Sequence, residues 1–356
     1  MESLAQLDSA RVIIGVDTHK DEHVAVAIDE RGALLGQFGL AATAVGYADL
    51  EAWALSLGPV IAFGVEGTGS YGAGLARSLA GRDHTVIEVN RPDRSTRRRV
   101  GKSDPIDAEM AARSVLAGVA TGQPKSGDDY VEMIRMLKVA KDSAVRARTQ
   151  AINQIKALIV TAPQELRVSL TGDSTHKLVA RCLALRPGSL TTPTAAAKHA
   201  LRSLARRHQQ LGAERDDLAA QLDVLTATTA PMLRATFGIG VDTAAALLVA
   251  AGDNPQRLRS EPAFAALCGT NPIPASSGKS QRHRLNRGGN RQANAALHRI
   301  AVVRLRWHQP TKDYANRRTT EGKTKPEIIR CLKRYIAREV YAILQHPADQ
   351  HIPHTA

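Results

Sequence analysis

The sequence predicts an N-terminal α/β domain with a mixed sheet, then long helices, then a mostly helical C-terminal part. Three observations lead to this prediction. Short apolar, β-branched runs alternate with turns over the first 90 residues, two later segments repeat apolar residues at three- and four-residue steps, and the last third is basic between helix-like stretches. We expect three domains, at residues 8–125, 126–230 and 231–348.

The first domain begins with a predicted meander of three strands. The strand-like runs are Arg11–Asp17, His23–Ile28 and Ala33–Leu40. After them we expect a helix at Val45–Leu57, a strand at Val60–Val65, a helix at Gly74–Gly81 and a strand at Thr85–Val89. Three hairpin-like strands followed by alternating helix and strand are typical of an α/β domain with a mixed sheet.

The charge balance indicates a nucleic-acid partner. The 356 residues include 48 Lys and Arg against 34 Asp and Glu, a net charge of +14. No apolar run reaches the roughly 18 residues of a membrane span, and no signal peptide is evident, so we expect a cytoplasmic protein with no membrane partner. Cys182, Cys268 and Cys331 are isolated, which argues against disulfides and zinc. Aromatic residues are 3% of the chain, which disfavours a base-stacking, single-strand-binding platform.

Four acidic residues are candidates for a metal site. Asp17 and Glu66 each stand where an apolar strand ends, and ligands of open α/β sheets collect at the carboxyl ends of strands. Asp104 and Asp107 are three residues apart, so they share one face of a helix that starts near Pro105. A helix cap, with Asp104 as N-cap, is the plainer interpretation of that pair alone. In a basic protein the four carboxylates together predict binding of Mg²⁺, which prefers hard oxygen ligands and activates phosphodiester chemistry.

Cations precede the second acidic pair and are expected to hold phosphates beside the metal. These candidate nucleic-acid-binding residues are Arg97, Arg98, Arg99 and Lys102.

Residues 130–160 and 201–225 carry heptad patterns. Examples are Ile134, Lys141 and Ile155 in the first segment, and Leu201 and His208 in the second. We expect two long helices, joined by a connector with short helices. Either they form a hairpin within one chain, or they form a coiled coil that joins subunits.

The C-terminal part contains two informative stretches. Leu233–Gly252 has Gly-Ile-Gly between two helix-like segments, as in a helix-hairpin-helix element that approaches a DNA phosphate. Pro274–Leu297 combines serines with dense cations. Gly278 after Ser277 permits a turn that could expose a nucleophilic hydroxyl, although spacing alone favours a flexible loop that grips the DNA backbone. The candidate nucleic-acid-binding residues in this stretch are Lys279, Arg282, Arg284 and Arg287. A basic amphipathic helix is expected at Pro326–Leu344.

Two sets of residues together resemble one family. The acids Asp17, Glu66, Asp104 and Asp107, and the Ser-Ser-Gly…Arg-Gly-Gly-Asn region near residues 276–290, resemble the DEDD transposases of insertion-sequence family 110, the RNA-guided bridge recombinases. The resemblance covers roughly residues 12 to 344, and it implies a bacterial, nucleoid-associated protein.

The resemblance implies an RNase H-like (RuvC-like) domain, a coiled-coil segment and a C-terminal transposase domain. It implies that Asp17, Glu66, Asp104 and Asp107 hold Mg²⁺, two ions in all, and that Ser277 attacks DNA to form a 5′-phosphoserine link. Ser276 is the adjacent alternative. The implied partners are donor and target double-stranded DNA, a structured non-coding guide RNA (the bridge RNA), and further copies of the chain in a dimer or tetramer.

Two other functions fit the residues. One is a metal-dependent nuclease or junction resolvase of the same fold that uses water as its nucleophile. The other is a basic architectural protein without catalysis. Replacement of Ser277 by Ala separates the nuclease from a serine recombinase, because a nuclease that uses water would still cut DNA. Replacement of Asp17 by Asn separates either enzyme from the architectural protein, which would be unaffected.

Overall fold

The computed structural model describes residues 11–90, 103–172, 174–276 and 283–345. The chain divides into two compact units. One contains residues up to 128 together with 251–259, and the other contains 129–250 and 260 onward. The three-domain division stays a prediction. None of the helices in the described residues has the length and hydropathy that a membrane crossing requires.

The first unit is built on a mixed sheet, as predicted. Within the described residues five strands pair in the order β3-β2-β1-β4-β5. The β1–β2 and β2–β3 pairs are antiparallel, whereas β1–β4 and β4–β5 are parallel. This arrangement is consistent with an RNase H-like fold. The strands are β1 (Val12–Thr18), β2 (Glu22–Asp29), β3 (Leu34–Ala41), β4 (Val60–Glu66) and β5 (Val86–Val89).

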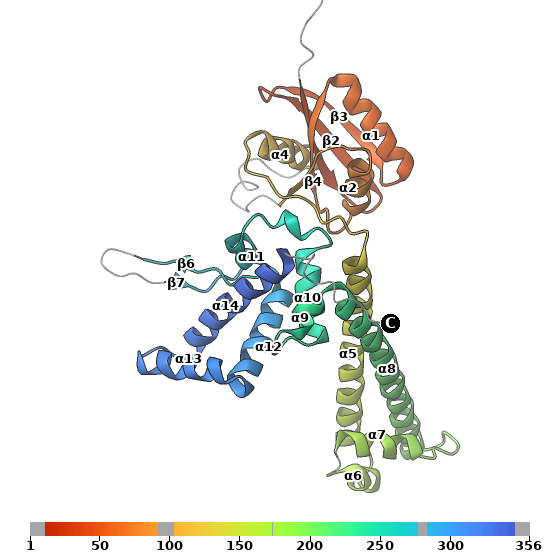
Figure 1. Ribbon diagram of the computed structural model, residues 1–356. Helices are drawn as coiled ribbons and strands as arrows, with labels where there is room; N and C mark the ends of the chain where they lie inside the picture. The colour runs from red at the N-terminus through yellow and green to blue at the C-terminus, as the bar shows by residue number, and fades with distance from the viewer. Residues whose placement is uncertain (1–10, 91–102, 173, 277–282, 346–356) are drawn as a thin grey trace, which may run out of the picture. The chain divides into compact units, whose positions relative to one another are not determined.

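Helices cover both faces of this sheet. On one face lie α1 (Ala44–Leu57) and α2 (Ala73–Ala80), and on the other lies α4 (Asp104–Leu116) (Figure 1). Alternation along β1 separates the two cores, because successive side chains of a strand point to opposite faces. Val12, Ile14 and Val16 pack in the core under α1 and α2, while Ile13 packs with alanines of α4. Every residue of β1 is buried, as expected of a central strand with both faces covered.

Two glycines let α4 lie directly on the sheet. Gly15 of β1 and Gly64 of β4 are register partners in the parallel pair. A Cβ atom at Gly15 would overlap backbone atoms of Ala108 and Ala112 in α4, and one at Gly64 would come within 2.7 Å of the Val115 side chain. The absence of side chains at this pair therefore sets how closely the helix backbone approaches β1 and β4.

A segment from the second half of the chain completes the first unit. Arg257, in the 3₁₀ helix η1 (Pro255–Arg257), donates to the Gln123 carbonyl (2.9 Å) and to the Glu88 carboxylate on β5 (3.1 Å). Asn254 accepts from the Ser126 amide and donates to the Pro124 carbonyl. Residues 121–126 are thereby held between β5 and the 251–259 segment.

The predicted long helices are present and pack on each other within one chain. Helix α5 (Tyr130–Thr161) runs antiparallel to α8 (Pro193–Thr229), and α6 (Gln164–Leu170) and α7 (Thr175–Ala184) form the connector (Figure 1). Heptad positions such as Ile134, Ile155 and Leu201 are fully buried. The hairpin alternative is therefore observed, and a coiled coil between subunits stays a prediction.

Two buried lysines of α5 are paired with carboxylates. Lys141 is buried on α5, and its ammonium group binds the carboxylate of Asp242 on α10 (Val241–Ala251). Lys138, also buried, binds Asp142 one turn away at 3.0 Å. A buried charge is tolerated when it is paired in this way.

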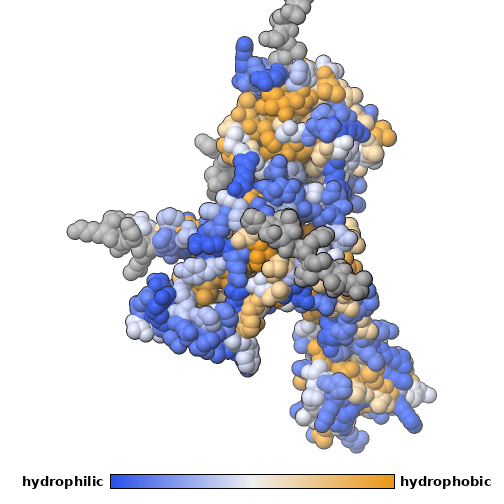
Figure 2. Space-filling model, viewed as in Figure 1, coloured by the Kyte–Doolittle hydropathy of each residue, from blue (hydrophilic) through white to orange (hydrophobic). Residues whose placement is uncertain are grey.

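The remaining chain is mostly helical, as predicted. A short hairpin pairs β6 (Ile273–Pro274) with β7 (His283–Arg284). Hydrophilic residues dominate the face of α13 (Gln309–Thr320) that is seen in Figure 2. The predicted helix-hairpin-helix stretch contains α9 and α10, with Gly238 at φ +83° in the turn between them. The helices are α9 (Pro231–Ala235), α10 (Val241–Ala251), α11 (Glu261–Leu267), α12 (Arg291–Trp307), α13 (Gln309–Thr320) and α14 (Lys325–Gln345).

The contact between α4 and the glycine pair can be tested by adding one methyl group. We expect Gly15→Ala to lower the free energy of unfolding by about 3 kcal/mol, because the new Cβ has no space beneath α4. Gly39→Ala is the matched control, since Gly39 is also a strand glycine but has open space around its Cβ position, and should change stability by less than about 0.5 kcal/mol. Urea denaturation measures both. Equal stability of the two variants would contradict the close contact.

Candidate functional site

The strand ends place two carboxylates side by side. Asp17 is the second-last residue of β1 and Glu66 is the last residue of the parallel neighbour β4. The Thr18 hydroxyl donates to the Glu66 carbonyl oxygen at 2.9 Å and ties the two strand ends together. Asp17 and Glu66 are two residues beyond Gly15 and Gly64, so by strand alternation they belong to the face that α4 covers. Both are buried, with 8% and 4% of their surface exposed.

The first turn of α4 brings the other two carboxylates to the same face of the sheet. Asp104 is the first residue of the helix, and Asp107 is one turn further on. The prediction that Asp104 is the N-cap is wrong by one residue. Ser103 has the extended backbone of an N-cap, and Asp104 and Pro105 lie inside the first turn, where carboxylates favour the positive end of the helix dipole. Asp107 is buried and the Asp104 side chain is half exposed.

His19 joins Asp17 to Asp104, and the sequence analysis missed it. Its Nε2 atom lies 3.3 Å from Oδ2 of Asp17 and 3.2 Å from Oδ1 of Asp104. The signal was present in the sequence, because His19 follows Asp17 by two positions and strand periodicity continued into the turn puts both on one side. An imidazole beside two carboxylates stabilises their charges when protonated and is a potential metal ligand when neutral.

The acids affect one another electrostatically. Burial raises the pKa of Asp17, the charge of His19 lowers it, and repulsion by Asp107 and Asp104 raises it further. The net shift is upward from 3.8. Crowded carboxylates with a raised pKa are typical of a site that gains stability from a cation.

The donor atoms suit a hard divalent cation. Ligand atoms of Asp17, His19 and Asp104 lie within 4.8 Å of one another, roughly the separation of ligands on opposite sides of one ion. Glu66 and Asp107 lie outside this trio as the side chains stand, although Asp107 is close enough to Asp17 to raise its pKa. The residues therefore fit a metal ion whose ligands are mostly carboxylate oxygens, with one imidazole nitrogen nearby.

The remaining predicted site residues belong to other parts of the chain. Arg284 is exposed on β7, and exposed Arg287 precedes α12. Ser276 is exposed just after β6. The other predicted residues lie outside the described ranges: Arg97, Arg98, Arg99, Lys102, Ser277, Lys279 and Arg282.

The raised pKa of Asp17 predicts a pH-dependent cost in the metal-free protein. Because the folded-state pKa exceeds 3.8, folding favours the protonated carboxyl, and stability falls as the pH rises through the folded pKa. We expect Asp17→Asn to unfold at higher urea than wild type at pH 7 in chelator, with the difference shrinking toward pH 4. Asp21→Asn, at an exposed position in the next turn, is the control and should match wild type. Destabilisation by Asp17→Asn at every pH would contradict the electrostatic account.

Two family models match the chain. Residues 14–162 match a family model for DEDD transposases of the IS110 type, described as "Transposase". Residues 230–316 match the model described as "Transposase IS116/IS110/IS902 family". The first match contains all four predicted acidic residues, and the second contains Ser276 and Ser277.

A relative from Streptomyces coelicolor is described as "Insertion element IS110 uncharacterized 43.6 kDa protein". It is 32% identical to this chain over 146 residues, which are 40% of this chain and 35% of the relative. The match thus spans about a third of the relative's length. Two family models in the expected order, together with this relative, show that the chain belongs to the IS110 family of transposases.

Proposed function

We propose that the protein is a DNA transposase that cuts and rejoins DNA strands at a metal site formed by Asp17, Glu66, Asp104 and Asp107. The observation that carries the proposal is the meeting of Asp17 and Asp104 around His19, where α4 starts above the ends of β1 and β4. The raised pKa of Asp17 and the repulsion among the carboxylates mean that this cluster does not stabilise the fold by itself. They are expected where cations and phosphates complete the site.

Each residue has a distinct part in the proposed chemistry. Asp17 and Asp104 would hold the metal together with Glu66 and Asp107. His19 contacts both aspartates and so orients their side chains. Before the metal binds, it also reduces the repulsion between the two carboxylates. When bound, Mg²⁺, which we propose as two ions, would neutralise charge at the scissile phosphate and would favour deprotonation of the attacking hydroxyl.

We propose Ser277 as the nucleophile, on the basis of the family and the Ser-Gly sequence. Its Oγ forms a bond to phosphorus while the bond from phosphorus to the 3′-oxygen breaks. The hydroxyl proton passes to solvent and the departing 3′-oxygen takes up a proton, which leaves a 5′-phosphoserine ester. The reverse step, with a different 3′-hydroxyl attacking the ester, rejoins the strands without an energy source.

We also propose the partners that the family implies. Donor and target DNA are the substrates, a structured non-coding guide RNA selects them by base pairing, and the active form is a dimer or tetramer. The net charge of +14 supports a polyanionic partner.

The metal site predicts that cleavage depends on specific carboxylates. We expect strand cleavage in Mg²⁺ or Mn²⁺ to fall by about a hundredfold or more in Asp17→Asn and in Asp104→Asn, because each removes a charged ligand. Asp21→Asn should retain activity. Cleavage is measured on end-labelled DNA supplied with the RNA from the flanking element. Full cleavage in excess chelator would disprove the metal site.

The serine predicts a covalent adduct at one residue. Digestion of a trapped reaction should yield a DNA-linked peptide whose modified residue is Ser277, and Ser277→Ala should abolish the adduct while DNA binding persists. Ser276→Ala is the adjacent control and should still form it. Cleavage without any adduct would instead indicate a nuclease that uses water. Recovery of cleavage on mixing Ser277→Ala with Asp17→Asn protein is expected if two subunits share one site.

A further inference from the structure

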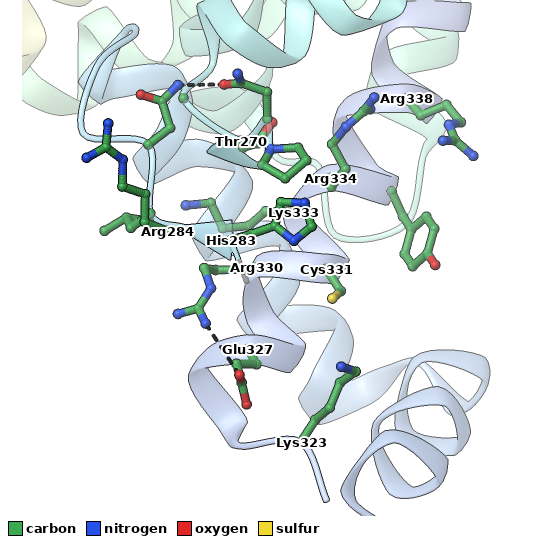
Figure 3. Close-up of a pocket in the computed structure, with 16 residues that line it drawn as sticks. Thr270, His283, Arg284, Lys323, Glu327, Arg330, Cys331, Lys333, Arg334 and Arg338 are labelled. Carbon is green, nitrogen blue, oxygen red and sulfur yellow. Dashed lines mark hydrogen bonds and ion pairs between the residues drawn. The ribbon is translucent and has the colours of Figure 1, made fainter. Parts of the chain in front are cut away.

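A basic pocket lies in the C-terminal part of the second unit, away in sequence from the carboxylate cluster. It encloses about 820 Å³ between the loop at residues 269–272, the stem of the β6–β7 hairpin and the part of α14 from Glu327 to Arg338 (Figure 3). Lys323, in the turn between α13 and α14, also lines the pocket. The volume is in the range of binding pockets for small or extended ligands.

Positive charge dominates the lining. Among the described residues that line the pocket, Glu327 is the acidic one, whereas six are arginine or lysine. These six are Arg284, Lys323, Arg330, Lys333, Arg334 and Arg338. Figure 3 shows them on several sides of the pocket, so the positive field comes from the hairpin, the turn and the helix together.

Acidic residues of the protein neutralise only part of this charge. Glu261 on α11 pairs with Arg334 and lies 3.9 Å from Arg338. Glu327 is 4.0 Å from Arg330, but one of its oxygens accepts from the backbone and hydroxyl of Thr324. Within the described residues, no carboxylate lies within 4.0 Å of the three other cations, which are Arg284, Lys323 and Lys333.

Lys333 is a buried cation in the pocket wall. It is 8% exposed, and its ammonium group donates to the side-chain oxygen of Asn294 at 2.6 Å. Asn294 in turn donates to the carbonyl oxygens of Cys268 and Gly269, which fixes its amide so that the oxygen faces Lys333. Burial lowers the pKa of Lys333. A buried cation with a neutral partner gains most from an anion that enters beside it.

The spacing on α14 indicates an extended anion. Arg330, Arg334 and Arg338 follow one another at four-residue intervals, so they share a helix face over about 12 Å. One strand of B-form DNA carries about three phosphates over that distance. Leu285 and Tyr335 line the same pocket and are half exposed, which offers apolar surface for sugars or bases.

We propose that this pocket binds the phosphodiester backbone of a nucleic-acid strand, with α14 following successive phosphates and Lys333 contacting one of them. The site deepens the proposed function by locating a strand-binding surface, but it does not depend on the metal chemistry. Arginine and lysine donate charge-assisted hydrogen bonds to phosphate oxygens, and such contacts position a strand without reading its sequence. DNA and RNA share this chemistry, and the test distinguishes them.

The test compares two triple variants of the full-length protein. The pocket variant is Arg284→Gln/Lys323→Gln/Arg330→Gln, which leaves the Glu261 pairs and Lys333 intact. The control variant is Lys156→Gln/Arg206→Gln/Arg207→Gln, which removes the same charge from exposed positions on α5 and α8. Fluorescence anisotropy in EDTA measures binding of single-stranded DNA, duplex DNA and RNA of one sequence over a range of salt concentrations. Cleavage does not occur in EDTA, so failure of the proposed chemistry leaves this result interpretable.

We expect the pocket variant to bind at least one of the three probes about tenfold more weakly than the control variant does. For a single strand, the slope of log affinity against log salt should also fall by about 2, because each lost phosphate contact removes about 0.7. The probe with the greatest loss identifies the strand that occupies the pocket. Equal losses of affinity in both variants for all three probes would overturn the proposal. Displacement of the strand by inorganic phosphate, added at the same concentration of phosphate groups as the strand contains, would overturn it as well.

Acetylation of the wild-type protein gives an independent readout if the pocket variant fails to fold. Lys323 should be protected from acetic anhydride by saturating strand, whereas Lys156 should react equally with and without it, as peptide mass spectrometry would detect. Unchanged reactivity of Lys323 at saturation would also overturn the proposal.

Discussion

The direct contact between α4 and the glycine pair of β1 and β4 is the constraint on which the proposed metal site depends. Without a side chain at Gly15 or Gly64, the helix backbone rests on the strands, and its first turn stands over their carboxyl ends. A larger residue at either position would lift the helix, and with it Asp104 and Asp107. The carboxylates therefore meet because of two residues that have no chemistry of their own. The buried alanines Ala108 and Ala112 of α4 allow the same close approach from the other side.

Electrostatics complements this packing. The first unit concentrates negative charge at one edge of its sheet, where burial and repulsion raise the pKa of Asp17. The second unit concentrates positive charge around α14 and the β6–β7 stem. Metal ions would neutralise the negative charge of the first unit, and a phosphate backbone would neutralise the positive charge of the second. The proposed function, in which the protein binds DNA and cleaves it at a metal site, needs both features.

Much of the fold was predictable because it depends on local patterns. Apolar runs marked the strands to within one or two residues, and heptad spacing marked α5 and α8. The acids at strand ends were predictable for the same reason. Features that depend on distant contacts were not. His19 gains significance only where α4 brings Asp104 beside it, the Asn254 and Arg257 contacts join residues more than 120 positions apart, and the pocket around Lys333 needs α11, α12 and α14 together. The N-cap error at Asp104 arose because Ser103 and Asp104 are both good caps, and sequence preference does not choose between them.

Anomalous X-ray diffraction from crystals of the protein soaked in Mn²⁺ tests the central claim most directly, because it locates the ion without relying on activity. The account predicts a strong anomalous peak between the side chains of Asp17 and Asp104, within coordination distance of both, with Glu66 or Asp107 turned toward it. Diffraction at the manganese edge that shows the carboxylates ordered but no peak between Asp17 and Asp104, or peaks only elsewhere on the protein, would contradict it.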